Sequence, residues 1–388
     1  MIPETTPAVT GASPGPLAFS RVVWLASLVF CGVLPVLTVV LLFTATIQDG
    51  TEALDFRQFY GAAEAILRGD DPYRLASESL TAWGGPYPYP PLPALLAIPL
   101  TIFSLQAAGL LLMAALVVVA LAIPFVLGVR DWRCYGLLLL WPPVISAIQT
   151  GNLTLLLGLG AALAWRFRER RLAVSMSIGV TLAAKLFLWP LVVWLAATRR
   201  LTSAVLTCAV GAGLLVLSWA AIGFSGLVDY PDLLRRLEDA VGDDSYTAYI
   251  VGLDIGLPSA LARVVWLSLG LGLLAVVVLV GRRGDERSAF ILAIAASLAF
   301  TPIVWLHYFA LLLVVVAVAQ PRLGVVWFVP LAMVVTPGSG HPTPFETSAT
   351  LVIAMLTVAL ALRSSVGGFK PVGSDLGPAP TRTSAAAA

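Results

Sequence analysis

One polar stretch near the N-terminus sets the organisation of the chain, and it contains three distinctive pieces. They read Asp55-Phe56-Arg57-Gln58-Phe59-Tyr60, then Gly69-Asp70-Asp71-Pro72-Tyr73, and then Tyr87-Pro88-Tyr89-Pro90-Pro91. The apolar run Val22–Ala45 precedes this stretch, and almost everything after it is hydrophobic. A loop this long between two apolar segments is uncommon unless it has a function. We therefore expect the rest of the chain to be a scaffold that holds this loop at a membrane surface.

The composition is that of a polytopic membrane protein. Of the 388 residues, 59% are hydrophobic and only 11% are charged, and the mean hydropathy is +0.94. These values exclude an ordinary soluble globule. The formal net charge of +2 gives no reason to expect nucleic acid as a partner. The two histidines and three scattered cysteines do not predict a zinc site, and the cysteines fit small core residues.

The apolar runs predict an all-α integral membrane protein, because one crossing of the hydrocarbon core takes about 20 apolar residues. We expect a bundle of about 12 transmembrane helices, within a range of about 11 to 13. The count depends on Leu92–Leu127, which fits one long broken span or two short ones, and on Leu172–Ala197, which is interrupted near Ala184-Lys185. The other predicted spans are Val22–Ala45, Tyr135–Ile148, Leu153–Trp165, Thr202–Ile222, Ala260–Val280, Ser288–Ile303, Tyr308–Ala319, Leu323–Val335 and Thr347–Leu362.

The chain divides into three regions. Residues 1–20 and 364–388 are rich in proline and small residues and predict disordered tails, whereas 21–363 form the membrane domain. Two long acidic loops, at 46–91 and 223–257, contrast with short connections that are rich in arginine, namely Arg130 and Arg133, Arg166 to Arg171, Arg199-Arg200, and Arg282-Arg283 with Arg287. Because cytoplasmic connections carry the excess of positive charge, we expect a plasma-membrane protein with both tails in the cytoplasm and both long loops outside.

Each long loop contains a predicted amphipathic helix. Phe56–Leu67 has apolar residues at helical spacing, so we expect a short helix on the membrane surface, with Asp55 as its N-cap and a stop at Gly69. Tyr230–Val241 in the second loop has the same amphipathic character. The stretch Tyr87–Pro91 is stiff and extended, because each proline restrains its own φ and the residue before it.

Four polar features allow both a chemical and a structural interpretation. Asp55 suits a general base at the membrane edge or a helix cap. Lys185 lies mid-way through an apolar run and suits binding of an anionic phosphate, or snorkelling to the outer interface. His307 suits orienting a carboxylate or binding phosphate, or is a satisfied histidine at the interface. The polar segment Gln149–Asn152 is either a turn or a set of neutral hydrogen-bond donors for a phosphate or sugar.

The tyrosines of the first loop also have two interpretations. Asp71-Pro72-Tyr73 taken alone is a turn, since Asp before Pro initiates turns. Tyr87 and Tyr89 either anchor the chain at the membrane interface or offer aromatic faces to a sugar or a lipid.

Taken together, these motifs form an ordered series. It consists of a first span, the outer-loop Asp55 with a Tyr-containing helix, a Gly-Asp-x-Pro-Tyr turn, a Tyr-x-Tyr-Pro-Pro-Leu motif, a Gly-Asn pair, a Lys…Pro pair and a late His307-Tyr308. The series resembles the polytopic glycosyltransferases of the GT-C class, and most of all glycosyltransferase family 87. The resemblance extends from Asp55 to Tyr308 and implies a GT-C-like transmembrane catalytic domain. Members of this family are actinobacterial mannosyl- and arabinofuranosyl-transferases that use polyprenyl-phosphate sugars.

The resemblance implies roles for individual residues. Asp55 would be the base of an inverting displacement, Lys185 would hold the donor phosphate, and His307 would position the base or the donor. The family pattern at the polar segment is Gly-Gln-x-Asn, whereas this chain has Gln149-Thr150-Gly151-Asn152, so the role of the asparagine is carried over with more assurance than that of the glutamine. The expected substrate-binding residues are Arg57, Tyr60, Asp71, Tyr73, Tyr87, Tyr89, Asn152, Lys185 and Tyr308.

The expected reaction is transfer of a sugar from a polyprenyl-phosphate donor to a glycolipid or polysaccharide of the cell envelope, on the outer face of the membrane. Mannose is the favoured sugar and arabinofuranose the next. Nothing in the chain resembles a nucleotide-sugar Asp-x-Asp site, which fits a lipid donor, and no cofactor or metal is expected.

Two other functions stay open at this point. A transporter or lipid flippase would have ionisable residues along a central path and repeat symmetry, and no inverted repeat is evident. A structural partner of an envelope-assembly complex would have no catalysis of its own.

Overall fold

The computed structural model describes residues 16–49, 53–73, 87–336 and 342–366. Every regular element within these residues is a helix, and none of them forms a strand. The all-α class is therefore confirmed. Most of both predicted tails lies outside the described residues, as do 74–86 of the first long loop; the first helix already begins at Pro16 and the last continues to Val366.

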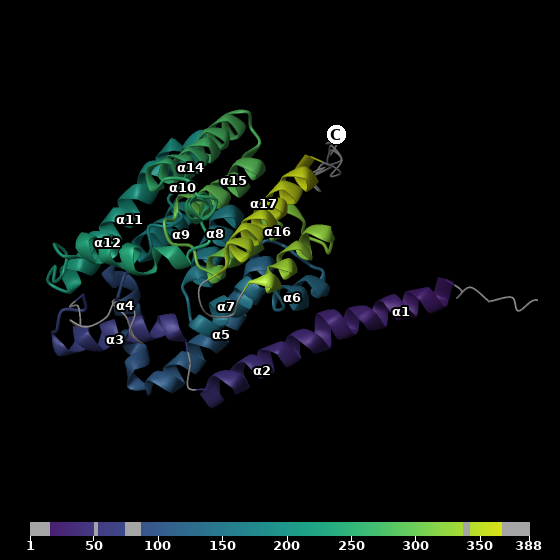
Figure 1. Cartoon of the computed structure of the whole chain (residues 1–388), viewed down its shortest axis with the longest axis horizontal. Coiled ribbons are helices and arrows are strands. Elements are labelled where there is room, and N and C mark those ends of the chain that lie inside the picture. Colours follow the sequence, from purple (N-terminus) through teal and green to yellow (C-terminus); the bar gives the residue numbers. More distant parts are fainter. Residues whose placement is uncertain (1–15, 50–52, 74–86, 337–341, 367–388) are drawn as a thin grey trace, which may run out of the picture.

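Short links join most of the elements. In chain order they are α1 (Pro16–Leu28), η1 (Val29–Val33), α2 (Leu34–Asp49), α3 (Leu54–Arg68), α4 (Pro91–Ala97), η2 (Ile98–Ile102), α5 (Leu105–Val126), α6 (Trp132–Leu138), α7 (Pro142–Thr150), α8 (Thr154–Arg166), α9 (Arg171–Ala184), α10 (Pro190–Ala197), α11 (Leu201–Ala221), α12 (Tyr230–Val241), η3 (Gly242–Asp244), α13 (Ala248–Asp254), α14 (Ser259–Arg282), α15 (Glu286–Phe300), η4 (Leu306–Leu311), α16 (Leu312–Ala319), η5 (Val325–Trp327), η6 (Val329–Val335) and α17 (Pro344–Val366). Figure 1 shows α1 and α2 as one long rod along the edge of the bundle.

The number of helices long enough to cross a membrane is smaller than predicted. Five described helices qualify by length and hydropathy, namely Arg21–Gln48, Leu105–Val126, Leu201–Ala221, Ser259–Arg282 and Pro344–Ser364. The bent pair α7 and α8, with 117° between its halves, would be a sixth. The prediction of about 12 spans is not confirmed, because several predicted spans correspond to helices shorter than a full crossing, such as Arg171–Ala184 and Leu306–Ala319.

The two predicted breaks are present. The first lies between η2 and α5, where Ser104 caps α5 by accepting a hydrogen bond from the amide of Ala107 at 3.3 Å. The second follows α9, where Lys185 adopts an extended backbone with φ −158° and ψ 122°. Pro190 then begins α10, a position where a proline costs no helical hydrogen bond.

The amphipathic helix of the first loop forms as α3, but its predicted N-cap is wrong. Asp55 is not the N-cap, since that position belongs to Ala53, and no side chain caps the helix. The apolar face, with Phe56, Phe59 and Ala63, is buried against the protein, and its place at the membrane surface stays a prediction. Gly69 ends the helix in the left-handed conformation, φ +76°, as predicted. The Asp55 carboxylate is consequently available to other partners.

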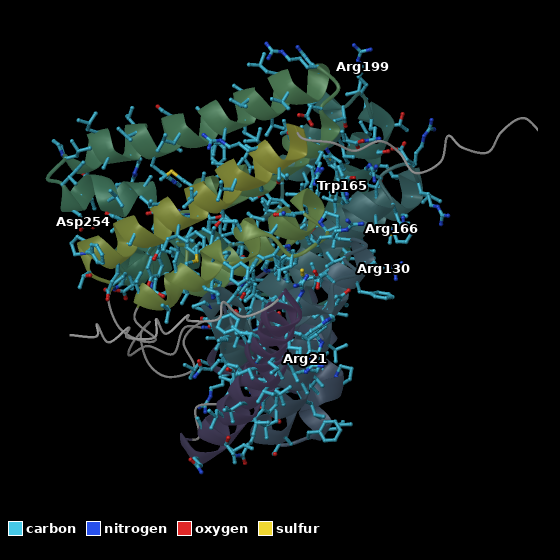
Figure 2. The ribbon with its side chains drawn as sticks, turned by 90° about the vertical axis from the view of Figure 1, so that its right-hand side faces the viewer. Arg21, Arg130, Trp165, Arg166, Arg199 and Asp254 are labelled. Atoms are coloured by element: carbon cyan, nitrogen blue, oxygen red, sulfur yellow. The ribbon has the colours of Figure 1, made fainter. Side chains whose placement is uncertain are left out.

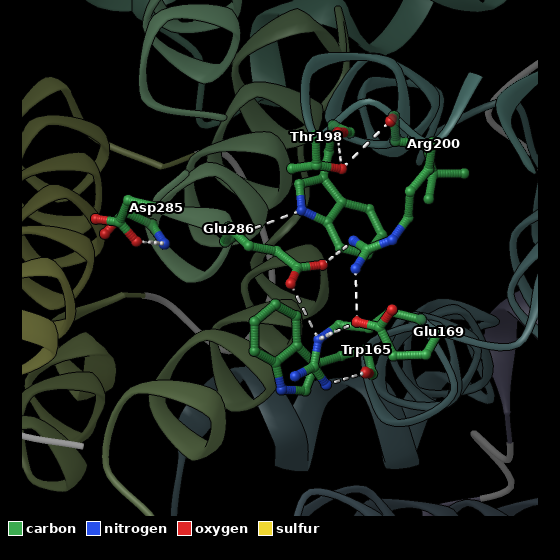
Figure 3. A network of polar contacts seen from close by, with 10 residues as sticks. Trp165, Glu169, Thr198, Arg200, Asp285 and Glu286 are labelled. Carbon is green, nitrogen blue, oxygen red and sulfur yellow. Dashed lines mark hydrogen bonds and ion pairs between the residues drawn. The ribbon is translucent and has the colours of Figure 1, made fainter. Parts of the chain in front are cut away.

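The arginine-rich connections lie together at one end of the bundle, which we call the arginine end. Glu286, at the start of α15, accepts hydrogen bonds from Arg168 (3.3 Å) and from Arg200, and Arg200 also pairs with Glu169 at 2.6 Å (Figure 3). These ion pairs join the α8–α9, α10–α11 and α14–α15 connections. Figure 2 shows Arg130, Arg166 and Arg199 along one edge and Asp254 at the opposite edge. Their grouping agrees with the charge pattern, while the side of the membrane stays a prediction.

Three short helices connect the arginine end to the opposite end, where the polar motifs meet. They are α8, α9 and α15, with 13, 14 and 15 residues. At 1.5 Å per residue each spans about 20 Å. The links at their far ends hold Asn152, Lys185 and the segment before His307, so the lengths of these helices bring three distant parts of the chain to one level.

Candidate active site

The centre of the site is a contact between Asp55 and Asn152. The Nδ2 amide of Asn152, in the link between α7 and α8, donates a hydrogen bond to Oδ2 of Asp55 at 2.7 Å. Asn152 is 2% exposed, whereas the Asp55 side chain is 25% exposed. The carboxylate is therefore held at one oxygen and still accessible to a substrate.

Close backbone packing holds this pair together. Gly151 ends α7 in the left-handed conformation, φ +66°, and the backbone N–H of Asn152 donates to the Ala147 carbonyl at 3.1 Å. A Cβ at Gly151 would lie 2.8 Å from the Cβ of Ala53 and 3.0 Å from that of Phe56. Because only glycine combines this φ with so close an approach, it places the end of α7 directly against the start of α3.

The side-chain amide of Asn152 has a second partner, Thr154, which was not expected from the sequence. Its Oδ1 accepts hydrogen bonds from both the backbone amide and the hydroxyl of Thr154, at 2.9 and 2.6 Å. An Asn side chain often accepts a hydrogen bond from the backbone two residues later at the start of a helix. The spacing of Asn152 and Thr154 in the sequence could therefore have indicated this contact. The role of Asn152 predicted from the sequence was substrate binding, and the structure gives it protein partners on both sides.

His307 approaches the same carboxylate from η4. Its Nε2 lies 3.7 Å from Oδ2 of Asp55, beyond hydrogen-bond distance, and the residue is 6% exposed. This nitrogen has no hydrogen-bond partner among the described residues. Since buried polar atoms are nearly always hydrogen-bonded, an unpartnered one that points at a carboxylate indicates a functional position.

Lys185 lies in a group of aromatic rings, which we call the aromatic cage and which consists of Tyr89, Phe187 and Tyr308. Its Nζ is 4.0 Å from the ring centroid of Tyr308, 5.1 Å from that of Tyr89 and 5.6 Å from that of Phe187. It also donates a hydrogen bond to the hydroxyl of Tyr308. The ammonium is near enough to Asp55 for their charges to interact. A cation is thus held beside the carboxylate by ring faces and one hydroxyl.

The Tyr-Pro stretch that supplies Tyr89 is held by other tyrosines. The hydroxyl of Tyr73 donates to the Tyr89 carbonyl at 2.9 Å, and that of Tyr87 donates to the Pro90 carbonyl at 2.6 Å. Burial raises the pKa of both the Tyr73 and the Tyr87 phenols, so each remains protonated and able to donate. Tyr230 of α12 donates to the Pro88 carbonyl at 2.9 Å, which links the second long loop to the first.

Not all predicted substrate-binding residues gather around Asp55. Tyr60 donates to the Phe103 carbonyl at 2.8 Å, and Asp71 accepts from the Tyr73 amide at 2.9 Å in a local turn. Together with Tyr73 and Tyr87 these residues therefore have structural partners, and their contact with substrate stays a prediction. Arg57 is half-buried two residues after Asp55 on α3.

Two apolar cavities have walls that include residues next to, or close in sequence to, those of the site. The first, of about 530 Å³, is lined by α3, α4, α5, α8 and α9; it begins beside Phe56 and Ala184, the neighbours of Asp55 and Lys185, and extends to Leu163 and Met176. The second, of about 640 Å³, lies between α13, α14, α15, α16 and α17, with Phe309 at its wall near His307.

A search of the described residues for three or more His, Cys, Asp or Glu side chains placed to hold a metal ion found no such group. Metal independence stays a prediction.

Comparison with known proteins identifies the family. The family model of glycosyltransferase family 87 matches residues 87–307, which is more than half of the chain. The match begins at Tyr87 and ends at His307, so it includes Asn152 and Lys185 and leaves Asp55 before its start. Searches of curated proteins and of solved structures found no match. The chain, with its several membrane-length helices, therefore belongs to glycosyltransferase family 87 and is a membrane glycosyltransferase.

Proposed function

We propose that this glycosyltransferase moves a sugar from a polyprenyl-phosphate donor to a glycolipid or glycan of the cell envelope. Mannose is the favoured sugar and arabinofuranose the next. The observation that carries the proposal is the placement of a partly exposed carboxylate, Asp55, beside a cation in an aromatic cage, Lys185. Sugar transfer from a phosphate needs both groups: a base for the acceptor hydroxyl and a positive charge for the departing phosphate.

In the proposed reaction, Asp55 takes the proton of an acceptor hydroxyl as that oxygen attacks the anomeric carbon of the donor sugar. A new C–O bond forms, and the bond between this carbon and the phosphate oxygen breaks. The electron pair of the broken bond stays with the polyprenyl phosphate, whose charge Lys185 stabilises. One displacement inverts the anomeric configuration, and a phosphate is a good enough leaving group to depart without a strong acid.

His307 completes the proposed site. Its Nε2 lies 3.7 Å from Oδ2 of Asp55 and has no hydrogen-bond partner among the described residues. A small movement on substrate binding would bring it within hydrogen-bond distance of the carboxylate or of the donor. Catalytic hydrogen bonds are often long before substrate binds and shorten in the complex, so this geometry supports a role in orienting the base.

The first cavity suits the hydrocarbon tail of the donor. Its walls are apolar, and it begins at the residues next to Asp55 and Lys185. From Ala184 to Met176 it follows α9 for about 12 Å toward the arginine end. A polyprenyl chain in this cavity would place its phosphate at the cavity mouth, beside the Lys185 ammonium.

The second cavity suits the apolar chains of a lipid acceptor. Its wall includes Phe309, two residues after His307, and parts of α14 and α17, both of which are long enough to cross a membrane. Donor and acceptor would thus occupy separate cavities. By the positive-inside rule the site, which lies opposite the arginine end, faces the outside of the plasma membrane.

Transport is the alternative that the test must separate from catalysis. A transporter or flippase would have ionisable groups along a central path, whereas Asp55, Lys185 and His307 meet at one end of the short helices. Asp55→Asn removes the base and nearly preserves its shape. We expect purified Asp55→Asn to transfer radiolabelled mannose or arabinofuranose from polyprenyl phosphate to envelope lipids at least about 100-fold more slowly.

The matched control is Asp70→Asn in the same loop. Asp70 is exposed and forms only a surface ion pair with Arg68 at 3.0 Å, which contributes little stability. This variant should keep the full transfer rate. Transfer by Asp55→Asn at the wild-type rate would contradict the assignment of the base.

A further inference from the structure

We propose that Asn152 and Thr154 act as a positioning relay that fixes the Asp55 carboxylate and directs its Oδ1 oxygen to the acceptor hydroxyl. This inference rests on the proposed role of Asp55 as the base. It replaces the substrate-binding role that the sequence suggested for Asn152, and it adds Thr154, which was not among the expected site residues.

The partners of the Asn152 side-chain amide fix its orientation. An amide can be turned over so that its oxygen and nitrogen exchange places, and the hydrogen-bond partners decide between the two orientations. Thr154 presents its backbone N–H to one end of the amide at 2.9 Å, and Asp55 presents a carboxylate oxygen to the other at 2.7 Å. Only the orientation with Oδ1 toward Thr154 and Nδ2 toward Asp55 satisfies both ends, so the amide must donate to the carboxylate.

The two oxygens of the Asp55 carboxylate have different surroundings. Asn152 donates to Oδ2, and the nearest approach of His307 is to the same oxygen. No hydrogen bond or ion pair to Oδ1 is present among the described residues. With Oδ2 fixed and the side chain 25% exposed, Oδ1 is the oxygen that can accept a proton from a substrate.

The backbone on both sides of the relay is held by close packing and by a helix. The contact of Gly151 with Ala53 and Phe56 fixes the distance between the two segments. Thr154 is the first residue of α8 and is 1% exposed, so its hydroxyl and amide are fixed by the helix. Neither end of the relay depends on a flexible side chain in solvent.

The other ionisable groups that face Asp55 come from separate segments. They are His307 and Tyr308 of η4, Lys185 after α9, and Tyr89 before α4. None of them accepts a hydrogen bond from Thr154, so a change at Thr154 acts on Asp55 through Asn152. Of these groups, Tyr89 also contacts Asn152 directly: its hydroxyl lies 3.5 Å from Nδ2 of Asn152.

The test follows the hydrogen bonding of the carboxylate without substrate. In the infrared spectrum of the purified full-length protein, with the spectrum of Asp55→Asn subtracted, the splitting between the two stretching bands of the Asp55 carboxylate reports the hydrogen bonds to its oxygens. Because Nδ2 of Asn152 donates to Oδ2 at 2.7 Å, Asn152→Ala should change this splitting. Thr154→Val should change it in the same direction by less, and Thr154→Ser should keep the wild-type splitting.

The same variants are assayed for kcat and KM in transfer from radiolabelled polyprenyl-phosphate sugar. Asn152→Ala should lower kcat about 100-fold, the effect of misplacing a reacting group by about 1 Å. The loss of kcat across the variants should follow the change in band splitting. The matched control is Thr357→Val in α17, whose buried hydroxyl bonds only to its own helix at 2.8 Å; this change should leave the splitting and the rate unchanged.

The outcomes separate this inference from the proposed function. If Asp55→Asn is inactive while Asn152→Ala and Thr154→Val both keep the wild-type band splitting and kcat, the relay is refuted and the base assignment stands. If Asn152→Ala only raises KM with no change in the substrate-free splitting, Asn152 binds substrate and the relay is also refuted. If Asp55→Asn is active, the proposed function itself fails.

Discussion

A methyl group added at Gly151 would test whether the contact between α7 and α3 sets the position of Asp55. In Gly151→Ala the new Cβ would lie 2.8 Å from the Cβ of Ala53, whereas carbon atoms rest at roughly 3.5 Å or more. The two segments must therefore separate by roughly 0.7 Å. The hydrogen bond between Asn152 and Asp55, now 2.7 Å, would lengthen to roughly 3.4 Å, which is too long for an effective bond.

The expected loss of stability in Gly151→Ala has two parts. A non-glycine residue at φ +66° costs roughly 1 to 2 kcal/mol. Overpacking against Ala53 and Phe56 costs roughly 1 to 3 kcal/mol more. The free energy of unfolding should thus fall by about 2 to 5 kcal/mol. The transfer rate should fall by about 100-fold, because the base is displaced from its acceptor.

Gly61→Ala is the matched control in the same region. Gly61 lies within α3, and a Cβ there would meet no atom within 4 Å. Because alanine is the better helix former, this variant should gain about 0.5 to 1 kcal/mol and keep its activity. Thermal unfolding in detergent and the radiolabelled transfer assay measure the two effects. A Gly151→Ala protein that melts and transfers sugar as the wild type does would refute the packing argument.

Two further predictions concern charged groups. Lys185→Met replaces the caged ammonium with an apolar side chain of similar shape, so KM for the polyprenyl-phosphate donor should rise about 10- to 100-fold while the melting temperature is kept; an unchanged KM would contradict phosphate binding. Asp131 lies outside the helices, and the Arg133 side chain, assisted by backbone amides, lowers its pKa below the ordinary value. Its stabilising contribution is therefore present above about pH 4 and is lost as the pH falls through the folded-state pKa. Asp131→Asn should lower the melting temperature at pH 7 and lower it less at pH 3; an equal effect at both pH values would contradict this reasoning.

Local patterns in the sequence predicted local structure well. The bounds of α12, Tyr230–Val241, agree with the prediction because its apolar spacing and flanking polar residues are both clear. The break at Lys185 was likewise visible as a polar residue inside an apolar run. The number of spans was not predictable in this way, since hydropathy does not distinguish a helix that crosses the bilayer from a shorter apolar helix that is packed against other helices.

The site was predictable in its residue types and not in its contacts. Asp55, Lys185 and His307 were noticeable because charged or ionisable side chains are costly in apolar surroundings. Their convergence depends on the lengths and packing of helices that separate them in the chain. For the same reason the partner of Asn152 could not be known from the sequence: its amide was assigned to a substrate, and it lies against a carboxylate 97 positions away.

The distribution of the site over four segments affects how the protein is made. Asp55 enters the membrane early in synthesis, whereas His307 belongs to the last third of the chain. At about 5 to 20 residues per second, the ribosome needs on the order of 10 to 50 seconds to supply the later segment. During this interval the carboxylate can have Asn152 and Lys185 as partners, and the proposed site lacks His307. Synthesis of the η4 segment with His307 is therefore the step that would complete the proposed site.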